Sequence, residues 1–493
     1  MPWSLGHCEE ETCPFVPARH TRDKFTAFHL DSRDRVLSVV HDIHRQFAVY
    51  ALKCYRFTLK LGSRGLSPEV MRVSWPLVGL WFLRLVSVTS SKTCTIKPLG
   101  QGIDDTSQIE AAITECGHFG TTVFEPGEYN VTRKMTWDLV SSRVDLHGYL
   151  NFKPDLVYWM KPENTYRVIF IQSQASWFVI TGHDFEVDAH NTGGIIGNGQ
   201  LWWSWYGNAT RLDGDGRPVA LTLSKVTRGT VSNFRIEAQP FWCNAVADSK
   251  DVVYDGMYCN ATNADPLYFG QNIVSNTDGI DTYRSDNVSL LNWDITCGDD
   301  CLAIKGNSTN ILARNITCRG GTGIAFGSLG QYHELVDNVN NVQLEDLTMI
   351  RPDPQIQPYM RSGVLIETVK GILQIMDRDD YWVPPTGGGG GRGLVSDVVV
   401  RSVQLDRVTT PIQLYQTNLG HAGDSPSPLQ FKNLAFVNWS GTASTDTNLE
   451  CSAAAPCEDI SFRDISITPT NGQPPTYTCI NVASVQLPGQ DVV

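Results

Sequence analysis

Two things are scarce in this sequence: charged residues and long apolar runs. Only 18% of the 493 residues are charged, and the formal net charge is −13. Proteins that bind nucleic acid or anionic membranes carry a basic surface, so this balance argues against both kinds of partner. The apolar run from Trp75 to Val88 is short and contains Arg84, so it is not expected to span a membrane.

Helix signals and paired metal-binding cysteines are scarce too. No two cysteines have the C-x-x-C spacing of a zinc finger. The chain is instead rich in Gly, Asn, Ser and Thr, which favours a β-rich extracellular protein. The clearest helix signal covers residues 104–116, where Ile109, Ala112 and Ile113 share one face. We expect this short helix to cap the open N-terminal end of a solenoid.

The N-terminal 91 residues differ from the rest of the chain. Residues 71–91 start with Met71 and Arg72, continue through the apolar run and end in small residues, which is the pattern of a secretory signal peptide. We therefore predict that residues 1–70 are an upstream extension foreign to the mature protein, and that residues 92–493 form its one folded domain. The alternative is a genuine N-terminal segment with a buried apolar stretch.

Two further features agree with secretion. After residue 91 there are ten cysteines, and an even number in a secreted chain indicates disulfide bonds. The chain also has seven N-x-S/T sequons, which predict N-glycosylation, at Asn130, Asn208, Asn260, Asn287, Asn307, Asn315 and Asn438. We expect a secreted, extracellular glycoprotein.

Several segments share one pattern: a polar start with Asn or Asp, an alternating apolar run, and a turn. Residues 285–297 and 308–318 are examples, and Asn287 and Asn310 take equivalent places in them, 23 residues apart. Runs this short cannot form separate sheets, and such a period is typical of a solenoid. The sequence therefore predicts an all-β fold, a right-handed parallel β-helix. A β-sandwich is the alternative, but it would show more hairpin turns and no such period.

Three carboxylates recur at this period. Asp299 and Asp300 follow Asp278 by 21 and 22 residues, so in a β-helix they lie on adjacent coils, whose backbones are about 4.8 Å apart. A turn or bulge can point the adjacent pair outward together. Carboxylates this close are unfavourable unless one holds a proton. Glycoside hydrolysis uses such a set, in which one group donates a proton and another activates water.

Clustered acids have two other uses in solenoids. Asp often caps turns, and acidic clusters bind calcium, as in β-helical lyases that abstract a proton with a basic residue. Calcium needs several oxygen ligands, and no comparable acidic cluster flanks these three. We therefore expect neither a metal nor another cofactor.

Three motifs resemble the polygalacturonase family, glycoside hydrolase family 28. They are N-T-D-G at 276–279, G-D-D-C at 298–301 and the Gly-rich block at 321–330, and the likeness runs from about Cys94 to Cys479. It implies a pectin-lyase-like β-helix that is the catalytic domain of an inverting hydrolase, acts on a pectic polysaccharide or oligosaccharide, and works as a monomer.

The resemblance also implies roles for single residues. Asp299 would be the general acid, and Asp278 and Asp300 would activate the water. A disulfide would join Cys301 to Cys318. Asn276, in the first motif, would contact the substrate.

The chain departs from the family pattern at two places. Thr322 stands where the family has an active-site His, and Glu367 stands where it has a Lys that grips the carboxylate of galacturonate. Both residues are still expected to contact the substrate. A Glu there would repel that carboxylate by like charge. Endo-cleavage of polygalacturonate is therefore not expected, and a neutral rhamnose in at least one subsite would explain the lost cations.

Other side chains are candidates to replace what is missing. Lys305 is the first choice for a substrate-binding cation, with Arg284 and Arg361 as alternatives. His333 and His421 are candidates for the missing His. Aromatic rings that could stack on sugars are Tyr415 and the cluster of Trp202, Trp203, Trp205 and Tyr206. Aromatic residues in a solenoid more often pack in its core.

The block at 323–332 and the Gly-rich stretch at 384–391 resemble the exo-acting, rhamnogalacturonan-associated fungal branch of the family. We expect an enzyme that releases one terminal sugar, with galacturonate favoured, from the non-reducing end of rhamnogalacturonan or galacturonan. Release of rhamnose by an α-L-rhamnosidase is the alternative. A catalytically inactive carbohydrate-binding β-helix and a lyase are further alternatives.

Overall fold

The computed structural model describes residues 92–169, 171, 174–207, 216–369, 390–418 and 426–488. The predicted extension (1–70), the predicted signal peptide (71–91), Asn208 and His421 lie outside these residues. Within the described part of the chain, no helix is long and apolar enough to cross a membrane.

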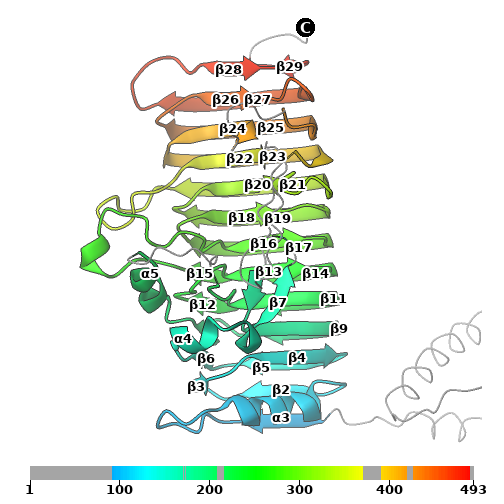
Figure 1. Ribbon diagram of the computed structural model, residues 1–493, viewed down its shortest axis with the longest axis vertical. Helices are drawn as coiled ribbons and strands as arrows, with labels where there is room; N and C mark the ends of the chain where they lie inside the picture. Colours follow the sequence, from blue (N-terminus) through cyan, green and yellow to red (C-terminus); the bar gives the residue numbers. More distant parts are fainter. Residues whose placement is uncertain are drawn as a thin grey trace, which may run out of the picture. The chain divides into compact units, whose positions relative to one another are not determined.

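The fold prediction is confirmed: the described residues form a right-handed parallel β-helix. Three stacks of parallel strands run along its axis (Figure 1). Stack A comprises β1 (Thr93–Ile96), β2 (Thr121–Phe124), β5 (Arg143–Leu146), the ends of β9 (Phe178–Asp188) and β11 (Leu221–Ser232), β14 (Lys250–Asp255), the starts of β17 (Asp286–Thr296), β19 (Ser308–Arg319), β21 (Val336–Ile350), β23 (Arg392–Val408), β25 (Gln430–Ala443) and β27 (Glu458–Pro469), and β29 (Val485–Gln486).

The other two stacks complete each coil. Stack B comprises β3 (Glu128–Val131), β6 (Tyr149–Phe152), β10 (Gly194–Ile196), β12 (Arg235–Glu237), β15 (Tyr258–Asn260) and the ends of β17, β19, β21, β23, β25 and β27. Stack C comprises β4 (Met135–Val140), the starts of β9 and β11, β13 (Asn244–Ala247), β16 (Ile280–Tyr283), β18 (Asp300–Ile304), β20 (Gly323–Leu329), β22 (Ser362–Val369), β24 (Thr410–Asn418), β26 (Thr447–Glu450) and β28 (Tyr477–Ile480).

Helices and one hairpin lie outside the stacks. They are α3 (Thr106–Cys116), α4 (Leu156–Trp159), α5 (Gly199–Gly207), the short 3₁₀ helices η1 (Pro162–Asn164) and η3 (Pro266–Tyr268), and the antiparallel pair β7 (Tyr166–Ile169) and β8 (Gln174–Ser176). The predicted capping helix is confirmed as α3, which buries Ile109, Ala112 and Ile113 at the N-terminal end of the β-helix (Figure 1).

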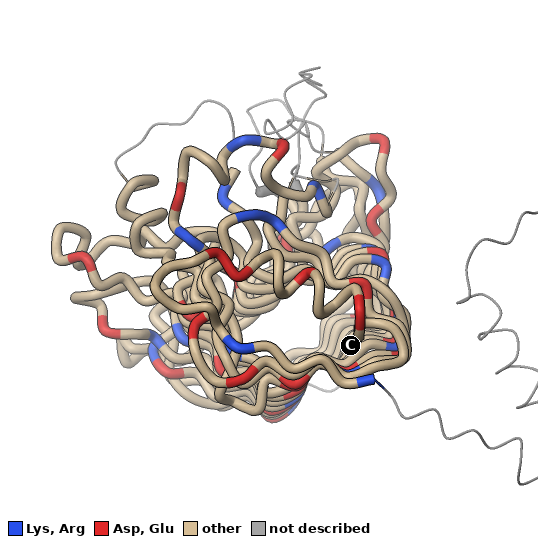
Figure 2. The backbone as a smooth tube through the Cα atoms, turned by 90° about the horizontal axis from the view of Figure 1, so that it is seen from below, with Lys and Arg blue, Asp and Glu red and all other residues tan. Residues whose placement is uncertain are grey.

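The alternating apolar residues fill the interior of the coil. In β17, Val288, Leu290 and Ile295 are fully buried, and the strand register places Val288 beside Ile311 of β19. Burial of each such side chain stabilises the fold by about 1.5–3 kcal/mol. Figure 2, which looks along the axis, shows the charged residues around the outside of the coil.

The Asn residues of the repeat make a bend within the stack A part of each strand. Asn287, Asn310 and Asn341 have φ of 56°, 54° and 54°, a left-handed conformation that Asn tolerates better than most residues. The Asn310 amide donates to Asp286 at 2.6 Å, and the Asn341 amide donates to Asn310 at 2.6 Å. The 23-residue interval is confirmed by this register, and the longer interval to Asn341 is explained by inserted residues between the coils.

Candidate active site

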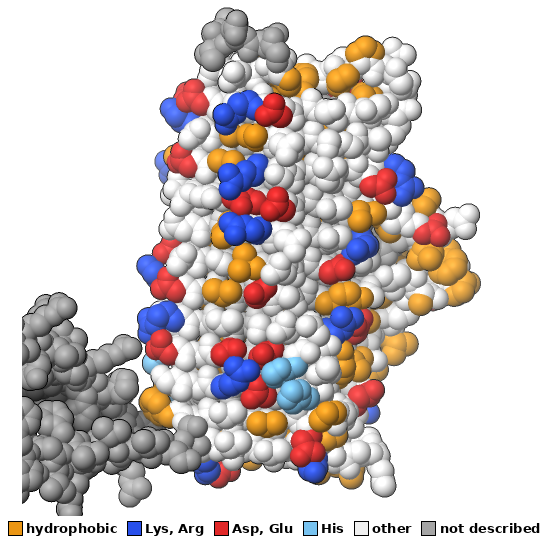
Figure 3. Space-filling model, turned by 180° about the vertical axis from the view of Figure 1, so that it is seen from behind, with side chains coloured by type: hydrophobic (Ala, Val, Ile, Leu, Met, Phe, Trp, Pro, Cys, Tyr) orange, Lys and Arg blue, Asp and Glu red, His pale blue; other side chains and the backbone are white. Residues whose placement is uncertain are grey.

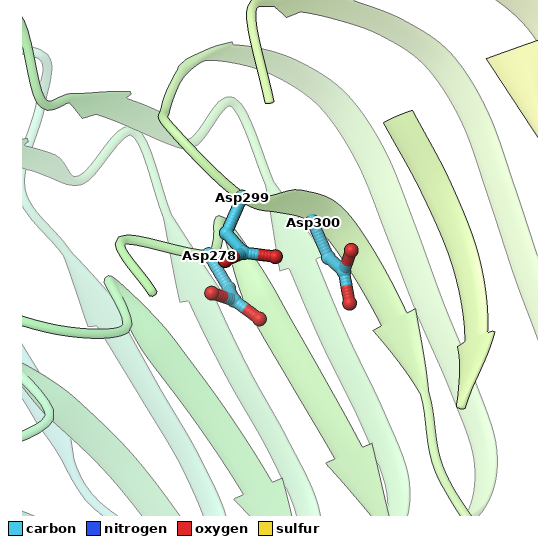
Figure 4. A group of neighbouring side chains, drawn as sticks. All are labelled: Asp278, Asp299 and Asp300. Atoms are coloured by element: carbon cyan, nitrogen blue, oxygen red, sulfur yellow. The ribbon is translucent and has the colours of Figure 1, made fainter. Parts of the chain in front are cut away.

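The structure brings the three predicted catalytic carboxylates together. Asp278 lies in the turn before β16, Asp299 directly precedes β18, and Asp300 begins it. Figure 4 shows their side chains grouped above two neighbouring coils. An oxygen of each lies within 4.8 Å of an oxygen of the other two. The register pairs Ile280 with Leu302, which sets Asp278 beside Asp300 as the sequence spacing predicts.

The turn that carries Asp299 requires a glycine on the neighbouring coil. Gly321 on the next coil has φ of 70°, and a Cβ atom there would lie 1.7 Å from the Asp299 carbonyl oxygen. Only Gly fits that close approach. The Thr322 amide donates to the same carbonyl at 2.7 Å, so the backbone of Asp299 is fixed from the coil above.

The side chain of Asp299 is fixed as well. One of its oxygens accepts hydrogen bonds from the Asn276 backbone N–H (3.1 Å) and side-chain amide (3.2 Å). The other oxygen accepts from the Thr322 hydroxyl at 3.3 Å. Asn276 and Thr322 therefore orient the carboxylate, a role that the sequence pattern did not indicate. Their predicted contact with substrate stays a prediction, although both line the cavity.

Burial and crowding change the proton affinity of Asp278 and Asp300. Burial is the largest influence on Asp278 and raises its pKa well above the usual range, with further increases from Asp281 and Asp299. Burial also raises the pKa of Asp300 well above that range, and Asp299 raises it further. Lys305 opposes both increases. Carboxyls that share a site in this way suit acid–base work, because one can hold a proton while another is ionised.

The acids open into a cavity of about 330 Å³, at the small end of the usual range for ligand sites. It is lined by Gln174, Phe241, Trp242, Asn276, Asp278, Asp299, Asp300, Lys305, Thr322, Ser328, Gln331, Arg361, Leu365 and Glu367. The predicted substrate-binding residues Asn276, Lys305, Thr322 and Glu367 thus share one cavity with the acids, and so does the alternative cation Arg361.

Other candidates lie elsewhere. Tyr415 is beside Glu367 in the sheet but does not line the cavity, so its substrate contact stays a prediction. Arg284 is paired with Asp248 at 2.9 Å outside the cavity, and His333 is exposed and also outside. Trp202 and Trp203 of α5 are buried in the core. The sequence did not show this, because the residue type of an aromatic side chain does not reveal which way it faces.

The described sequons differ in exposure. Asn287, Asn307, Asn315 and Asn438 are exposed, and Asn260 is half-buried. Asn130 is only 8% exposed, and its backbone N–H donates to the buried Asp105 carboxylate at 2.7 Å, so its burial argues against a glycan there. N-glycosylation at the other described sites stays a prediction.

The three carboxylates are the one group, within the described ranges, whose oxygens are close enough for a metal ion. Acidic groups are common without a metal ion, and here Lys305 already supplies a positive charge beside Asp278 and Asp300. The expectation that no metal or cofactor is needed stays a prediction.

The disulfide implied by the resemblance is present. Cys301 pairs with Cys318 directly below the catalytic turn, and Cys94–Cys116, Cys243–Cys259 and Cys451–Cys457 are also bonded. Among the described cysteines, Cys297 and Cys479 are free, and Cys297 is buried with its sulfur 3.4 Å from that of Cys301.

We predict that the double variant Cys301→Ser/Cys318→Ser loses about 3 kcal/mol of unfolding free energy, because the bond closes a loop of intermediate length. Both cysteines must be changed, since Cys297 is close enough to pair with Cys301 if Cys318 alone is removed. Urea unfolding would measure the loss, with Cys297→Ser as the matched control. A double variant as stable as the control would contradict the prediction.

Comparison with known proteins agrees with this geometry. The sequence model of "Glycosyl hydrolases family 28" matches residues 137–357 and 387–487. The chain belongs to this family. It is therefore a glycoside hydrolase.

Named relatives align with most of this chain. This chain is 40% identical over 421 residues (80% of this chain, 92% of the relative) to "Putative galacturan 1,4-alpha-galacturonidase A" of Aspergillus niger. It is 30% identical over 400 residues (79% and 87%) to "Alpha-L-rhamnosidase rgxB" of the same species. The solved endo-xylogalacturonan hydrolase of Aspergillus tubingensis matches with a TM-score of 0.66 at 22% identity, covering 81% of this chain and 99% of that one, and supports the fold.

Proposed function

We propose that this family 28 enzyme releases single galacturonate residues from the non-reducing ends of pectic chains, either rhamnogalacturonan or galacturonan, by inverting hydrolysis. We also propose that it is secreted and works as a monomer. The observation that carries the exo-action is an apolar wall beside the active-site cavity, two of whose rings line that cavity.

The wall covers the outer face of stack C on the coils before the acids. Ala245 and Ala247 of β13 and Tyr283 of β16 point outward, where a soluble β-helix would ordinarily face water. They are buried with Phe241 and Trp242, which lie just before β13, and with residues from more distant parts of the chain: Ile169, Ile171, Val219 and Tyr332. Figure 1 shows β7 lying beside β13. The register joins β13 to β16 and β16 to β18, so the wall stands next to the carboxylates.

Two rings of the wall also line the cavity. Phe241 and Trp242 are stacked, with centroids 5.2 Å apart, and both are 2% exposed. A groove that cleaves inside a polymer must be open at both ends, and we propose that the two rings block this one on the side of the preceding coils. A sugar held between the rings and the acids would be the terminal sugar of its chain, and because its anomeric carbon is the one attacked, it would come from the non-reducing end.

The residues divide the chemistry as the resemblance implies. Asp299 donates a proton to the leaving oxygen, and Asp278 or Asp300 takes a proton from the attacking water. Inverting enzymes usually hold their carboxyls about 6.5–9.5 Å apart, and the closest oxygens here lie within 4.8 Å. Inversion is therefore proposed from the family resemblance and not from this spacing. NMR of the first anomer released tests it.

Galacturonate is favoured as the released sugar because the 40% identical relative is named a galacturonidase. Release of rhamnose is the second candidate, because Glu367 puts a further negative charge in the cavity and a 30% identical relative is named a rhamnosidase.

The two candidates are separated by incubating the enzyme with oligogalacturonides, rhamnogalacturonan oligosaccharides and a nitrophenyl rhamnoside, and identifying the sugar released. Galacturonate as the sole early product supports the proposal, and free rhamnose supports the second candidate. A mixture of longer oligosaccharides contradicts exo-action. An unsaturated product that absorbs ultraviolet light indicates a lyase, and no product from any of them indicates an inactive binding protein.

A further inference from the structure

A buried ion pair lies at the bottom of the active-site cavity. The Lys305 ammonium is 3.1 Å from a carboxylate oxygen of Asp281, and the two residues are 3% and 0% exposed. The ammonium also donates to the Gly327 carbonyl at 3.1 Å and lies 5.0 Å from the ring centre of Trp242. Lys305 reaches the cavity surface, where it lies among the residues that line it with Asp278 and Asp300.

The β-helix geometry explains how this pair forms. Asp281 points outward from β16, and its register neighbours on the next two coils are Ala303 and Ala325. These small side chains leave room for Lys305, which directly follows β18, to lie back across the sheet towards Asp281.

The burial of this ion pair sets it apart from the ion pairs on the outer surface. Figure 3 shows acidic and basic side chains gathered along the axis of one outer face, and such exposed pairs contribute little to stability. A buried pair is rarely more stabilising than two apolar residues in its place, so stability alone does not account for Lys305 and Asp281.

The charges that face the catalytic carboxyls are mostly negative. Besides Asp278, Asp299 and Asp300 themselves, they are Asp281 from β16, Glu367 from β22, Arg361 at the cavity edge before β22, and Lys305, with Asp337 of β21 behind Lys305. Lys305 is the cation that acts on both Asp278 and Asp300. Its charge is already matched by Asp281, so it is poorly suited to grip the carboxylate of a substrate.

We propose that Lys305, held in place by Asp281, is a positioning residue whose positive charge keeps Asp278 or Asp300 ionised, so that this carboxylate can take the proton of the attacking water. This inference rests on the proposed hydrolytic function. It replaces the expectation that Lys305 anchors the substrate.

The direction of the effect follows from the charges. Lys305 lowers the pKa of both carboxyls, and Asp281 raises the pKa of both. The base must be ionised, so activity falls as the pH drops below its pKa. This falling part of the pH–activity profile is its acid limb. Loss of the Lys305 charge should move the acid limb to higher pH, and loss of the Asp281 charge should move it to lower pH.

The test is the pH dependence of kcat/KM for sugar release by four proteins: wild type, Lys305→Met, Asp281→Asn and the double variant. We expect the acid limb to move up by about one to three pH units in Lys305→Met, since an opposite charge at close range shifts a carboxyl pKa by that amount. We expect it to move down in Asp281→Asn, and to return to near the wild-type position in the double variant. Arg284→Met, which removes an exposed cation outside the cavity, is the matched control and should leave the limb in place.

Several results would overturn the inference. A folded Lys305→Met enzyme with an unmoved acid limb and a raised KM would make Lys305 a substrate anchor, and one with neither change would make it purely structural. If Lys305→Met does not fold, Asp281→Asn and the double variant still decide. The inference expects the limb to move to lower pH in Asp281→Asn and to return in the double variant, whereas a purely structural pair would leave it in place in both.

A wild type that releases no sugar refutes the proposed function separately. The inference is then tested by carbon-13 NMR titration of the Asp carboxyls in wild type and Asp281→Asn. Carboxyl pKa values that are lower in Asp281→Asn support it, and unchanged values overturn it.

Discussion

Replacing Asp299 by Asn should lower kcat by about 10²–10⁴-fold, the usual contribution of a positioned proton donor. Asn has nearly the same shape, and its oxygen and amide can still meet Asn276 and Thr322, which hold the side chain from two directions. The loss should therefore come from chemistry and not from misfolding. The initial rate of monosaccharide release measures it, with thermal unfolding as the check on the fold.

Two controls make this result specific. Asp294→Ala removes a carboxylate of the outer surface, where Asp294 is paired with Arg319, and a surface pair of this kind contributes little. It should leave kcat unchanged. A substrate with a nitrophenol leaving group needs little protonation, so it should recover much of the activity of Asp299→Asn but not of Asp300→Asn. An Asp299→Asn enzyme that keeps most of its activity on oligosaccharides would contradict the assignment.

The fold could be predicted because its signals are local and repeated. The alternating residues of β17 and β19 and the Asn residues at their bends recur at one interval, and each copy makes the same contacts in the structure. The meeting of Asp278 with Asp299 and Asp300 follows from that same interval. The length of one coil was therefore enough to place residues more than 20 positions apart on one site.

The apolar wall could not be predicted in this way. It joins Ile169 of β7 with Val219, Trp242 and Tyr332, which lie outside the strands, and these residues share no period. The Asp281–Lys305 pair was also missed, although both residues lie close to the motifs. Asp281 follows Asp278 by three residues, and nothing in the sequence shows that its side chain lies under Lys305. Both features depend on how loops and long side chains pack on the outside of the coil, which the repeat does not encode.

The charge of Glu367 leads to the second large effect. Glu367 lies on β22, two coils beyond Asp300, on the side of the acids away from Trp242. In the proposed reaction this side holds the sugar that leaves. A galacturonate there would meet a like charge, whereas a neutral rhamnose would not. The wild type should therefore cleave a galacturonate–rhamnose bond faster than a galacturonate–galacturonate bond.

We predict that Glu367→Lys changes this preference by about 10–100-fold in favour of the galacturonate–galacturonate bond, because a charge-assisted hydrogen bond of about 1.5–3 kcal/mol replaces a repulsion. The measurement is the ratio of kcat/KM for two oligosaccharides that differ only in the second sugar, at one pH. Because both substrates use the same acid and base, any effect of the new charge on Asp300 cancels in the ratio. Glu367→Gln removes the repulsion without adding a cation, so its ratio should lie between those of the wild type and Glu367→Lys. A ratio that is the same in all three proteins would mean that Glu367 does not face the leaving sugar, and rhamnose would then have to be sought at the other end of the cavity, beside Trp242.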